Sequence, residues 1–239
     1  TIFSIKITSI SFQEPQFLLS KKSDKNFLPL RRDITDRNGD LISRSIGSYH
    51  AAIKPNLIKD KEKFLLNIKL NFPEISQDLL KKNLLNGKYF YLKKRLSAEE
   101  ENKLFLLGEK GIIFERTQSR IYPHAELYSH ILGQIDDDNY GISGVEKYFD
   151  NEIKDLKKIK EPLKLTLDTN LQYLIKKELE QSIEDFKAVG AGGLLMNIQT
   201  GEVLSLVSLP DYDINLRNDI SHSDYTNKIT KSVFELGSV

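Results

Sequence analysis

The chain has 239 residues, of which 39% are hydrophobic and 29% are charged; these proportions are typical of folded globular proteins and exclude an intrinsically disordered chain. Thirty-five basic residues against 34 acidic ones leave a net charge of +1, which excludes the broad positive field that nucleic acid binding requires. The sequence contains no cysteine, so disulfide bonds, thiolate nucleophiles and thiolate metal ligands are excluded as well.

The first segment, residues 2–12, alternates apolar and polar side chains from Phe3 to Thr8 and therefore predicts an extended strand. It is too short for a transmembrane helix, and Lys6 interrupts it. It also lacks the basic start and the small-residue cleavage site of a signal peptide. We therefore expect any membrane anchor of the native protein to lie upstream of Thr1.

Residues 31–117 predict a mixture of strands and helices. The charged stretch 31–40 ends in Asn38-Gly39, which favours a tight turn. Strands are expected at residues 48–53, 89–92 and 112–117, and helices at residues 57–70, 74–85 and 97–107. The third helix has the clearest start, because Ser97 and Glu100 form a capping-box pattern, and Gly87 and Gly108 provide helix stops.

Residues 118–151 predict irregular structure, and the basic run 154–160 is interpreted as a solvated linker. We place a domain boundary there, which gives one domain at residues 1–160 and a second at residues 161–239. The second begins with a strand at 163–167 and a long helix capped by Asp168 or Thr169. Its apolar face consists of Leu171, Leu174, Ile175, Leu179, Ile183 and Phe186. A hairpin follows, with strands at 192–198 and 203–209, so the expected fold class is α+β.

Six short motifs occur in a specific order. They are Arg32-x-Ile34-x-Asp36-Arg37-Asn38-Gly39, Arg120-x-Tyr122-Pro123 with His130-Ile131-Leu132-Gly133, Gly141-x-x-Gly144-Val145-Glu146-x-x-Phe149-Asp150, Leu165-Thr166-Leu167-Asp168-x-x-Leu171-Gln172, Thr200-Gly201-Glu202-Val203-Leu204 with Pro210-Asp211-Tyr212-Asp213-Ile214-Asn215, and Phe234-Glu235-Leu236-Gly237-Ser238. In this order the motifs resemble class B penicillin-binding proteins from about Arg31 to the last residue. Residues 51–55 and 92–111 are more similar to the septal, cell-division branch than to the elongation branch.

The resemblance implies an elongated pedestal (dimerisation-type) domain, followed by the first helix and hairpin of a serine transpeptidase (β-lactamase-like) domain. It implies a peptidoglycan D,D-transpeptidase that cross-links septal cell wall and binds β-lactams. It implies Ser238 as the nucleophile, with the chain ending directly after it. The implied location is the periplasmic face of the bacterial inner membrane. The implied partners are peptidoglycan stem peptides and division-complex membrane proteins, including a glycan polymerase.

Serine needs an adjacent base to act as a nucleophile, and in Ser-x-x-Lys the lysine lies one helical turn further on. The chain contains no complete Ser-x-x-Lys, no Ser-x-Asn and no Lys-Thr-Gly. We therefore expect this chain alone to be inactive and not to be acylated by penicillin. A non-catalytic scaffold of the division machinery remains the alternative function, because every motif before Phe234 is compatible with it.

Other candidate sites have structural interpretations. The side chains of Arg32, Asp36 and Arg37 are expected to form an ion-paired network, and Arg120 with Glu146 another. The four histidines lack metal-ligand spacing and are expected to pack or lie on the surface, and no metal or cofactor is expected. Gly190-x-Gly192-Gly193 precedes a strand instead of opening a helix, so a dinucleotide site is not expected. Tyr89, Phe90 and Tyr91 are assigned to core or interface packing.

Overall fold

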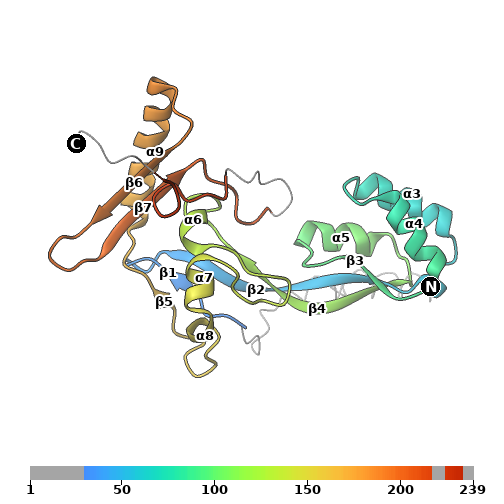
Figure 1. Ribbon diagram of the computed structural model, residues 1–239. Coiled ribbons are helices and arrows are strands. Elements are labelled where there is room, and N and C mark those ends of the chain that lie inside the picture. Colours follow the sequence, from blue (N-terminus) through green and yellow to red (C-terminus); the bar gives the residue numbers. More distant parts are fainter. Residues whose placement is uncertain (1–29, 217–223, 234–239) are drawn as a thin grey trace, which may run out of the picture.

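The structure is a computed structural model that describes residues 30–216 and 224–233. Its central element is the long strand β2 (Leu41–Ile53). Strand β4 (Ile112–Ile121) runs antiparallel along it, paired from Arg44–Ile121 to Ile53–Ile112 (Figure 1). Only the apolar ends of both strands, residues 48–53 and 112–117, were predicted from the sequence. The other halves were missed because their residues are mostly polar or small, as in Arg44-Ser45 and Gln118-Ser119.

Strands β2 and β4 together form a long two-stranded ribbon. At one end of this ribbon lies a small α/β unit, which we call the head (residues 54–111). Strand β3 (Phe90–Lys93) pairs with the end of β2, and α3 (Lys61–Asn71), α4 (Gln77–Asn86) and α5 (Ala98–Leu106) pack beside it. Its core includes Ala51, Ile53, Phe64, Ile68, Leu80, Leu84 and Leu104. The head therefore has a hydrophobic core of its own.

Helix boundaries in the head follow the local capping residues. Helix α3 begins later than predicted, because the short 3₁₀ helix η1 (Pro55–Leu57) precedes it and Asp60 caps its first turn. The predicted capping box of Ser97 is confirmed at α5. The predicted stop at Gly87 is also confirmed, since this residue ends α4 with a φ of 65° that favours glycine.

The opposite end of the ribbon, which we call the junction, combines segments that lie far apart in the sequence. Strand β1 (Ile34–Thr35) pairs antiparallel with β2, and β5 (Leu163–Lys164) adds in parallel to β1. Helices α6 (Ser129–Leu132) and α7 (Gly144–Tyr148) lie within residues 118–151, a segment that was expected to be irregular, and α8 (Asp150–Ile153) begins at its end. The predicted strand 163–167 is shorter than expected. A second core unites these parts: Ile34, Ile42, Tyr122, Tyr128, Leu132, Ile153, Leu167, Tyr212 and Ile214.

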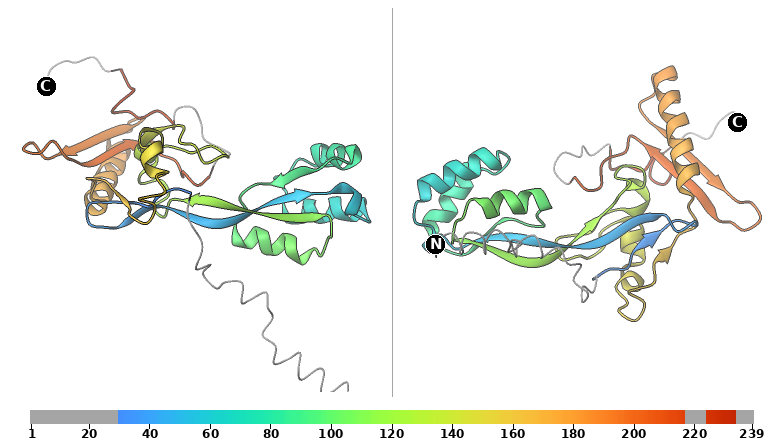
Figure 2. Two further views of the ribbon diagram at one scale, coloured as in Figure 1. Left: turned by 90° about the horizontal axis from the view of Figure 1, so that it is seen from below. Right: turned by 180° about the vertical axis from the view of Figure 1, so that it is seen from behind.

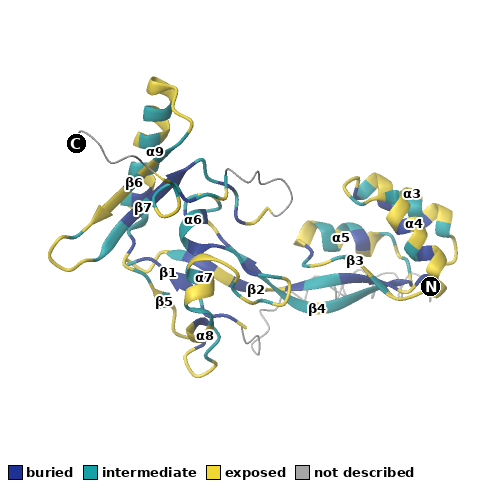
Figure 3. Cartoon of the chain, in the orientation of Figure 1, coloured by how far each residue is buried: buried dark blue, intermediate teal, exposed yellow. Residues whose placement is uncertain are grey.

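The last described unit is helix α9 (Thr169–Phe186) packed against the hairpin of β6 (Ala191–Met196) and β7 (Val203–Leu209). A Cβ at Gly193 would lie 2.9 Å from the Ile175 side chain, so the glycine lets the helix approach the strand closely. The predicted apolar face of α9 is only partly covered. Leu174 is 53% exposed and Phe186 is 82% exposed, and exposed residues extend along the outer turns of α9 and the hairpin tip (Figure 3).

The elements form an elongated molecule with the head at one end and α9 with its hairpin at the other (Figures 1 and 2). The fold is mixed, with helices and strands interleaved along the chain. Across residues 30–216 and 224–233, no helix combines the length and the apolar character that membrane crossing requires.

Candidate functional site

The predicted nucleophile Ser238 lies outside the described residues. His222, the Phe234–Ser238 motif and the predicted strand at 2–12 lie outside them as well. The remaining motifs meet at the junction, where the ribbon contacts α9 and the segment after β7. The junction is therefore the candidate functional site that the structure describes.

A buried carboxylate, Glu146, is the centre of the junction. The Nε and Nη2 atoms of Arg31 donate to its Oε2 at 2.9 and 2.6 Å, and Nε of Arg120 donates to its Oε1 at 2.8 Å. The side chains of Arg31 and Glu146 are 0% exposed and that of Arg120 is 1% exposed. The predicted pair of Arg120 and Glu146 is confirmed, whereas the role of Arg31 was not predicted.

A second carboxylate balances the charge of this cluster. Asp150 contacts Nη1 of Arg31 at 2.5 Å and also pairs with Lys154. Burial alone would raise the pKa of Asp150, but hydrogen bonds from Arg31 and Lys154 outweigh it and hold the pKa below its ordinary value. The hydroxyl of Tyr122 donates to Glu146, and burial raises the pKa of this phenol. Charged groups buried in this way are stable only when each is paired, as here.

The predicted ion-paired network of Arg32, Asp36 and Arg37 is wrong in its partners. The guanidinium of Arg32 donates to main-chain carbonyls, including those of Glu161 at 2.6 Å and Pro162 at 3.2 Å. Arg37 forms a half-exposed ion pair with Glu202 at 3.6 Å. The five N–H donors of arginine can bind carbonyl oxygens as well as carboxylates. The two arginines therefore bind other segments of the chain and do not form ion pairs with Asp36.

Asp36 connects the ribbon to the start of α9. Its Oδ2 accepts hydrogen bonds from the main-chain N–H and the hydroxyl of Thr169, at 3.1 and 2.8 Å. Its Oδ1 accepts from the N–H groups of Asn38 and Asp40, which closes the predicted turn. Burial would raise the pKa of Asp36, but these hydrogen bonds lower it. Asp168 is the N-cap residue of α9, so two carboxylates serve the same helix start.

Gln172 of α9 forms hydrogen bonds to two other segments of the chain. Its amide donates to the carbonyls of Leu127 and Leu206 at 3.0 and 2.7 Å. Its carbonyl accepts from the Ser205 hydroxyl at 2.8 Å and the Leu206 N–H at 2.9 Å. The residue is 0% exposed, and all four hydrogen-bonding positions of its amide are used. Gln172 therefore fixes α9 to β7 and to the loop after β4.

The segment after β7 is held against the same loop. Asn215 donates to the Tyr122 carbonyl and accepts from the Tyr122 N–H, both at 3.0 Å. The His130 ring lies 2.9 Å from the Pro210 carbonyl, and Lys176 lies 2.5 Å from Asp211. Burial would lower the pKa of the Lys176 amine, but Asp211 and the nearby Glu126 raise it.

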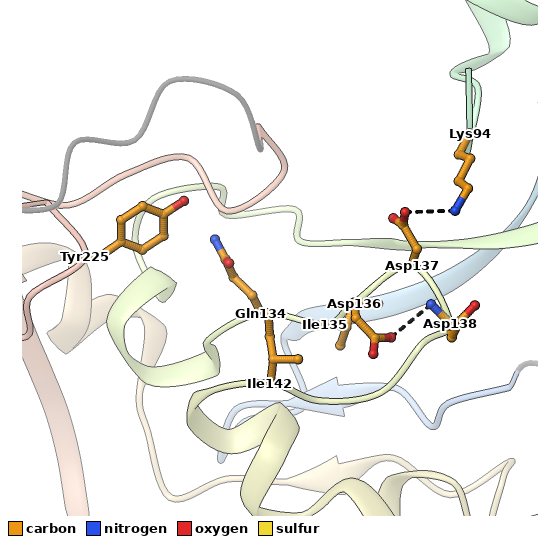
Figure 4. Close-up of a pocket in the computed structure, with 8 residues that line it drawn as sticks. All are labelled: Lys94, Gln134, Ile135, Asp136, Asp137, Asp138, Ile142 and Tyr225. Carbon is orange, nitrogen blue, oxygen red and sulfur yellow. Dashed lines mark hydrogen bonds and ion pairs between the residues drawn. The ribbon is translucent and has the colours of Figure 1, made fainter. Parts of the chain in front are cut away.

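A polar hollow of about 570 Å³ lies beside the junction, between the loop 134–142 and Tyr225 (Figure 4). Asp137 at its rim pairs with Lys94 at 3.0 Å. The carboxylate of Asp136 accepts the main-chain N–H groups of Asp138 and Tyr140, so it stabilises the loop. No group of His, Asp or Glu side chains in the described part of the chain could hold a metal ion.

The remaining predicted residues have structural roles. The ring of His50 accepts a hydrogen bond from the Arg95 N–H, and His124 packs edge-on against Tyr128. Gly192 and Gly193 lie within β6. Phe90 packs on the head core, whereas Tyr89 and Tyr91 remain about half exposed. Their hydroxyls both donate to Glu115, a cluster that sequence reasoning did not predict.

The ribbon with its head and most of the junction corresponds to the dimerisation domain of penicillin-binding proteins. The family model described as "Penicillin-binding Protein dimerisation domain" matches residues 27–163, and the chain belongs to this family. The predicted resemblance to class B penicillin-binding proteins and the predicted fold class are thereby confirmed.

Relatives with transpeptidase names match the chain over much of its length. The probable peptidoglycan D,D-transpeptidase FtsI of Caulobacter vibrioides is 29% identical over 209 residues, which cover 87% of this chain and 36% of the relative. The peptidoglycan D,D-transpeptidase FtsI of Escherichia coli K12 is 28% identical over 174 residues, which cover 64% of this chain and 30% of the relative. The chain thus spans about a third of the length of these two relatives.

A solved structure shares the fold. Penicillin-binding protein PBP2 from Helicobacter pylori, in complex with MreC, superposes with a TM-score of 0.56 at 22% sequence identity. The match covers 86% of this chain and 46% of that one.

Proposed function

We propose that the chain is the front part of a septal peptidoglycan D,D-transpeptidase, with a pedestal at residues 1–160 and the start of the transpeptidase domain at residues 161–239. The family match and the FtsI relatives support this proposal. The family model ends at residue 163, close to the proposed boundary.

The reaction we propose is acyl transfer by Ser238. Its hydroxyl attacks the carbonyl between the two terminal D-alanines of a stem peptide, and the last D-alanine leaves as an amine. The acyl group then passes from the serine to an amine on a neighbouring stem. A lysine one helical turn beyond Ser238 would accept the hydroxyl proton, and penicillin would acylate the same serine. No cofactor takes part.

The polar docking of α9 at the junction is the observation that carries this proposal. Asp36, Gln172 and Asn215 bind main-chain groups on both sides of the proposed boundary. Such contacts hold the start of the second domain in one orientation on the pedestal. A transpeptidase needs this rigidity, because acyl transfer depends on positioning its reacting groups closely.

We also propose a location and partners for the whole protein. A septal transpeptidase acts on the periplasmic face of the inner membrane, and we place its anchor upstream of Thr1. Stem peptides and division-complex membrane proteins, including a glycan polymerase, are the proposed partners. The complex of PBP2 with MreC supports partner binding by a protein of this fold.

Covalent labelling by a fluorescent penicillin tests the proposal. We expect the native protein, extended beyond Val239, to be labelled at one site, and Ser238→Ala to abolish the label. Ser232→Ala is the matched control and should leave labelling intact. The 239-residue chain alone should not be labelled. An intact native protein that takes no label, or that lacks a lysine three positions after Ser238, would support the scaffold alternative instead.

A further inference from the structure

The part of the head that contains α3 and α4 carries a concentration of unpaired positive charge. Residues 59–88 contain seven lysines and four acidic residues, a net charge of +3 in a chain whose total is +1. Six of these lysines are exposed: Lys59, Lys63, Lys69, Lys81, Lys82 and Lys88. Within the described residues none of the six forms an ion pair, whereas Lys93, Lys94 and Lys103 in the same head all do. The charge is therefore available to an outside partner.

Helices α3 and α4 also expose leucines. In α3 the core side chains Phe64 and Ile68 are 0% exposed, but Leu66 and Leu70, on the opposite side of the helix, are 56% and 71% exposed. Residues four apart lie on one helix face, so these two leucines form a stripe. In α4, Leu79 and Leu85 are exposed by 58% and 72%. A helix that is apolar on its outer side as well as its inner side is expected to have a second contact surface.

Lysines flank the leucine stripe of α3. By the helical repeat of about 3.6 residues, Lys63 lies on one side of Leu66 and Leu70, and Lys69 lies on the other. A lysine in such a position can lay its methylene stem along an apolar surface while its amine reaches outward to anionic groups. This arrangement of leucine flanked by lysine is typical of helices that lie in a membrane interface.

The composition of the surface favours lipid over protein. Protein–protein interfaces are enriched in aromatic residues and arginine at their centre and depleted of lysine. The exposed side chains of α3 and α4 include several lysines and leucines, and neither helix contains arginine. The only aromatic side chain in the two helices is Phe64, which is buried in the core. Figures 1 and 2 show α3 and α4 at the end of the molecule away from α9, where a planar surface can reach them.

We propose that the outer face of α3 and α4 is a peripheral binding surface for a bilayer containing anionic phospholipid. The lysines bind headgroup phosphates, and Leu66 and Leu70 enter the headgroup–acyl boundary. This proposal depends on the head alone and is independent of the transpeptidase chemistry.

Co-sedimentation of the full 239-residue chain with vesicles tests the proposal. We expect binding to vesicles of one part phosphatidylglycerol to three parts phosphatidylcholine, and much weaker binding to phosphatidylcholine alone. Raising the salt concentration should weaken binding, because ions screen exposed charges. Each lysine near an anionic surface contributes about fivefold in affinity, so the variant Lys63→Gln/Lys69→Gln/Lys82→Gln should bind about 100-fold more weakly.

Matched variants separate the head from other surfaces. The triple variant Lys157→Gln/Lys158→Gln/Lys160→Gln removes the same charge from the other basic run and should bind within about twofold of the parent chain. The variant Leu66→Ser/Leu70→Ser should weaken binding about tenfold, because it removes exposed apolar area. The control variant Leu194→Ser/Met196→Ser, on the exposed hairpin, should not weaken vesicle binding. Thermal unfolding confirms that each variant remains folded.

A fluorescent probe gives an independent measurement. Because the sequence has no cysteine, Leu70→Cys can carry a single environment-sensitive dye. Its emission should shift to the blue on adding anionic vesicles, whereas the dye at Lys157→Cys should show no shift. The proposal is overturned if the chain does not bind anionic vesicles, if both triple-lysine variants bind equally, or if the dye at position 70 does not respond. No vesicle binding would favour a protein partner for this face.

Discussion

Glu146 illustrates how one side chain organises the junction at the residue scale. It is 0% exposed and accepts hydrogen bonds from two buried arginines that lie 115 and 26 positions away in the sequence. Removing one member of a buried ionic cluster leaves the others without compensation, which costs about 3–5 kcal/mol. We expect Glu146→Gln to lower the free energy of unfolding by that amount, measured by urea denaturation.

The control for this prediction is Glu152→Gln, since Glu152 lies in the same region with an exposed side chain. It should change the free energy of unfolding by less than about 0.5 kcal/mol. Equal destabilisation by the two substitutions would show that the buried pairing is not what stabilises the junction.

Residues of this kind limit what the sequence could predict. Arg120 and Glu146 were correctly paired, because both belong to recognisable motifs. Arg31 lies in the charged stretch 31–40 and Gln172 in the fourth motif, but the buried roles of both residues were not predicted, because polar side chains are usually found on the surface. Their burial depends on partners brought close only by the folded ribbon, and no local pattern reports such partners.

At the scale of elements, the position of α9 depends on a polar side chain. Gln172→Leu would leave the N–H and C=O of Leu206 and the C=O of Leu127 without this partner, at about 1–3 kcal/mol for each buried group left unpaired. We expect a loss of about 3 kcal/mol and faster hydrogen exchange in β7. The control substitution Gln181→Leu, at an exposed position of α9, should change neither the free energy of unfolding nor hydrogen exchange in β7. If the amides of β7 remain protected from hydrogen exchange in Gln172→Leu, the hydrogen bonds of Gln172 are not needed to hold α9 on β7.

The boundaries of helices and strands show which local sequence signals were sufficient to predict where an element begins or ends. Asp168, Ser97 and Gly87 mark helix ends correctly, because each acts through main-chain groups within a few residues. Strand β2 was predicted too short, since its pairing with β4 extends over polar residues that lack an apolar alternation. Short-range chemistry was therefore easier to predict than long-range pairing.

At the scale of the whole molecule, two separate cores share one pair of strands. Phe64 belongs to the head core and Ile153 to the junction core. Truncating a buried Phe or Ile to alanine costs about 2–5 kcal/mol. We expect Phe64→Ala to accelerate hydrogen exchange in α3 and α4 and to leave the junction protected, and Ile153→Ala to do the reverse. Uniform acceleration by either substitution would mean that the two cores unfold as one.

The stretch of ribbon between the two cores has a mechanical consequence. In β2, Ser43 is the last residue paired with β1 and Ala51 is the first paired with β3, so over residues 44–50 the described sheet consists of β2 and β4 alone. A strip of this shape bends easily across its flat face and resists bending within its plane. We therefore expect the head to move relative to the junction by bending of the two-stranded ribbon across its flat face. The right-handed twist of the strands determines the orientation of that face, and so the direction of the motion.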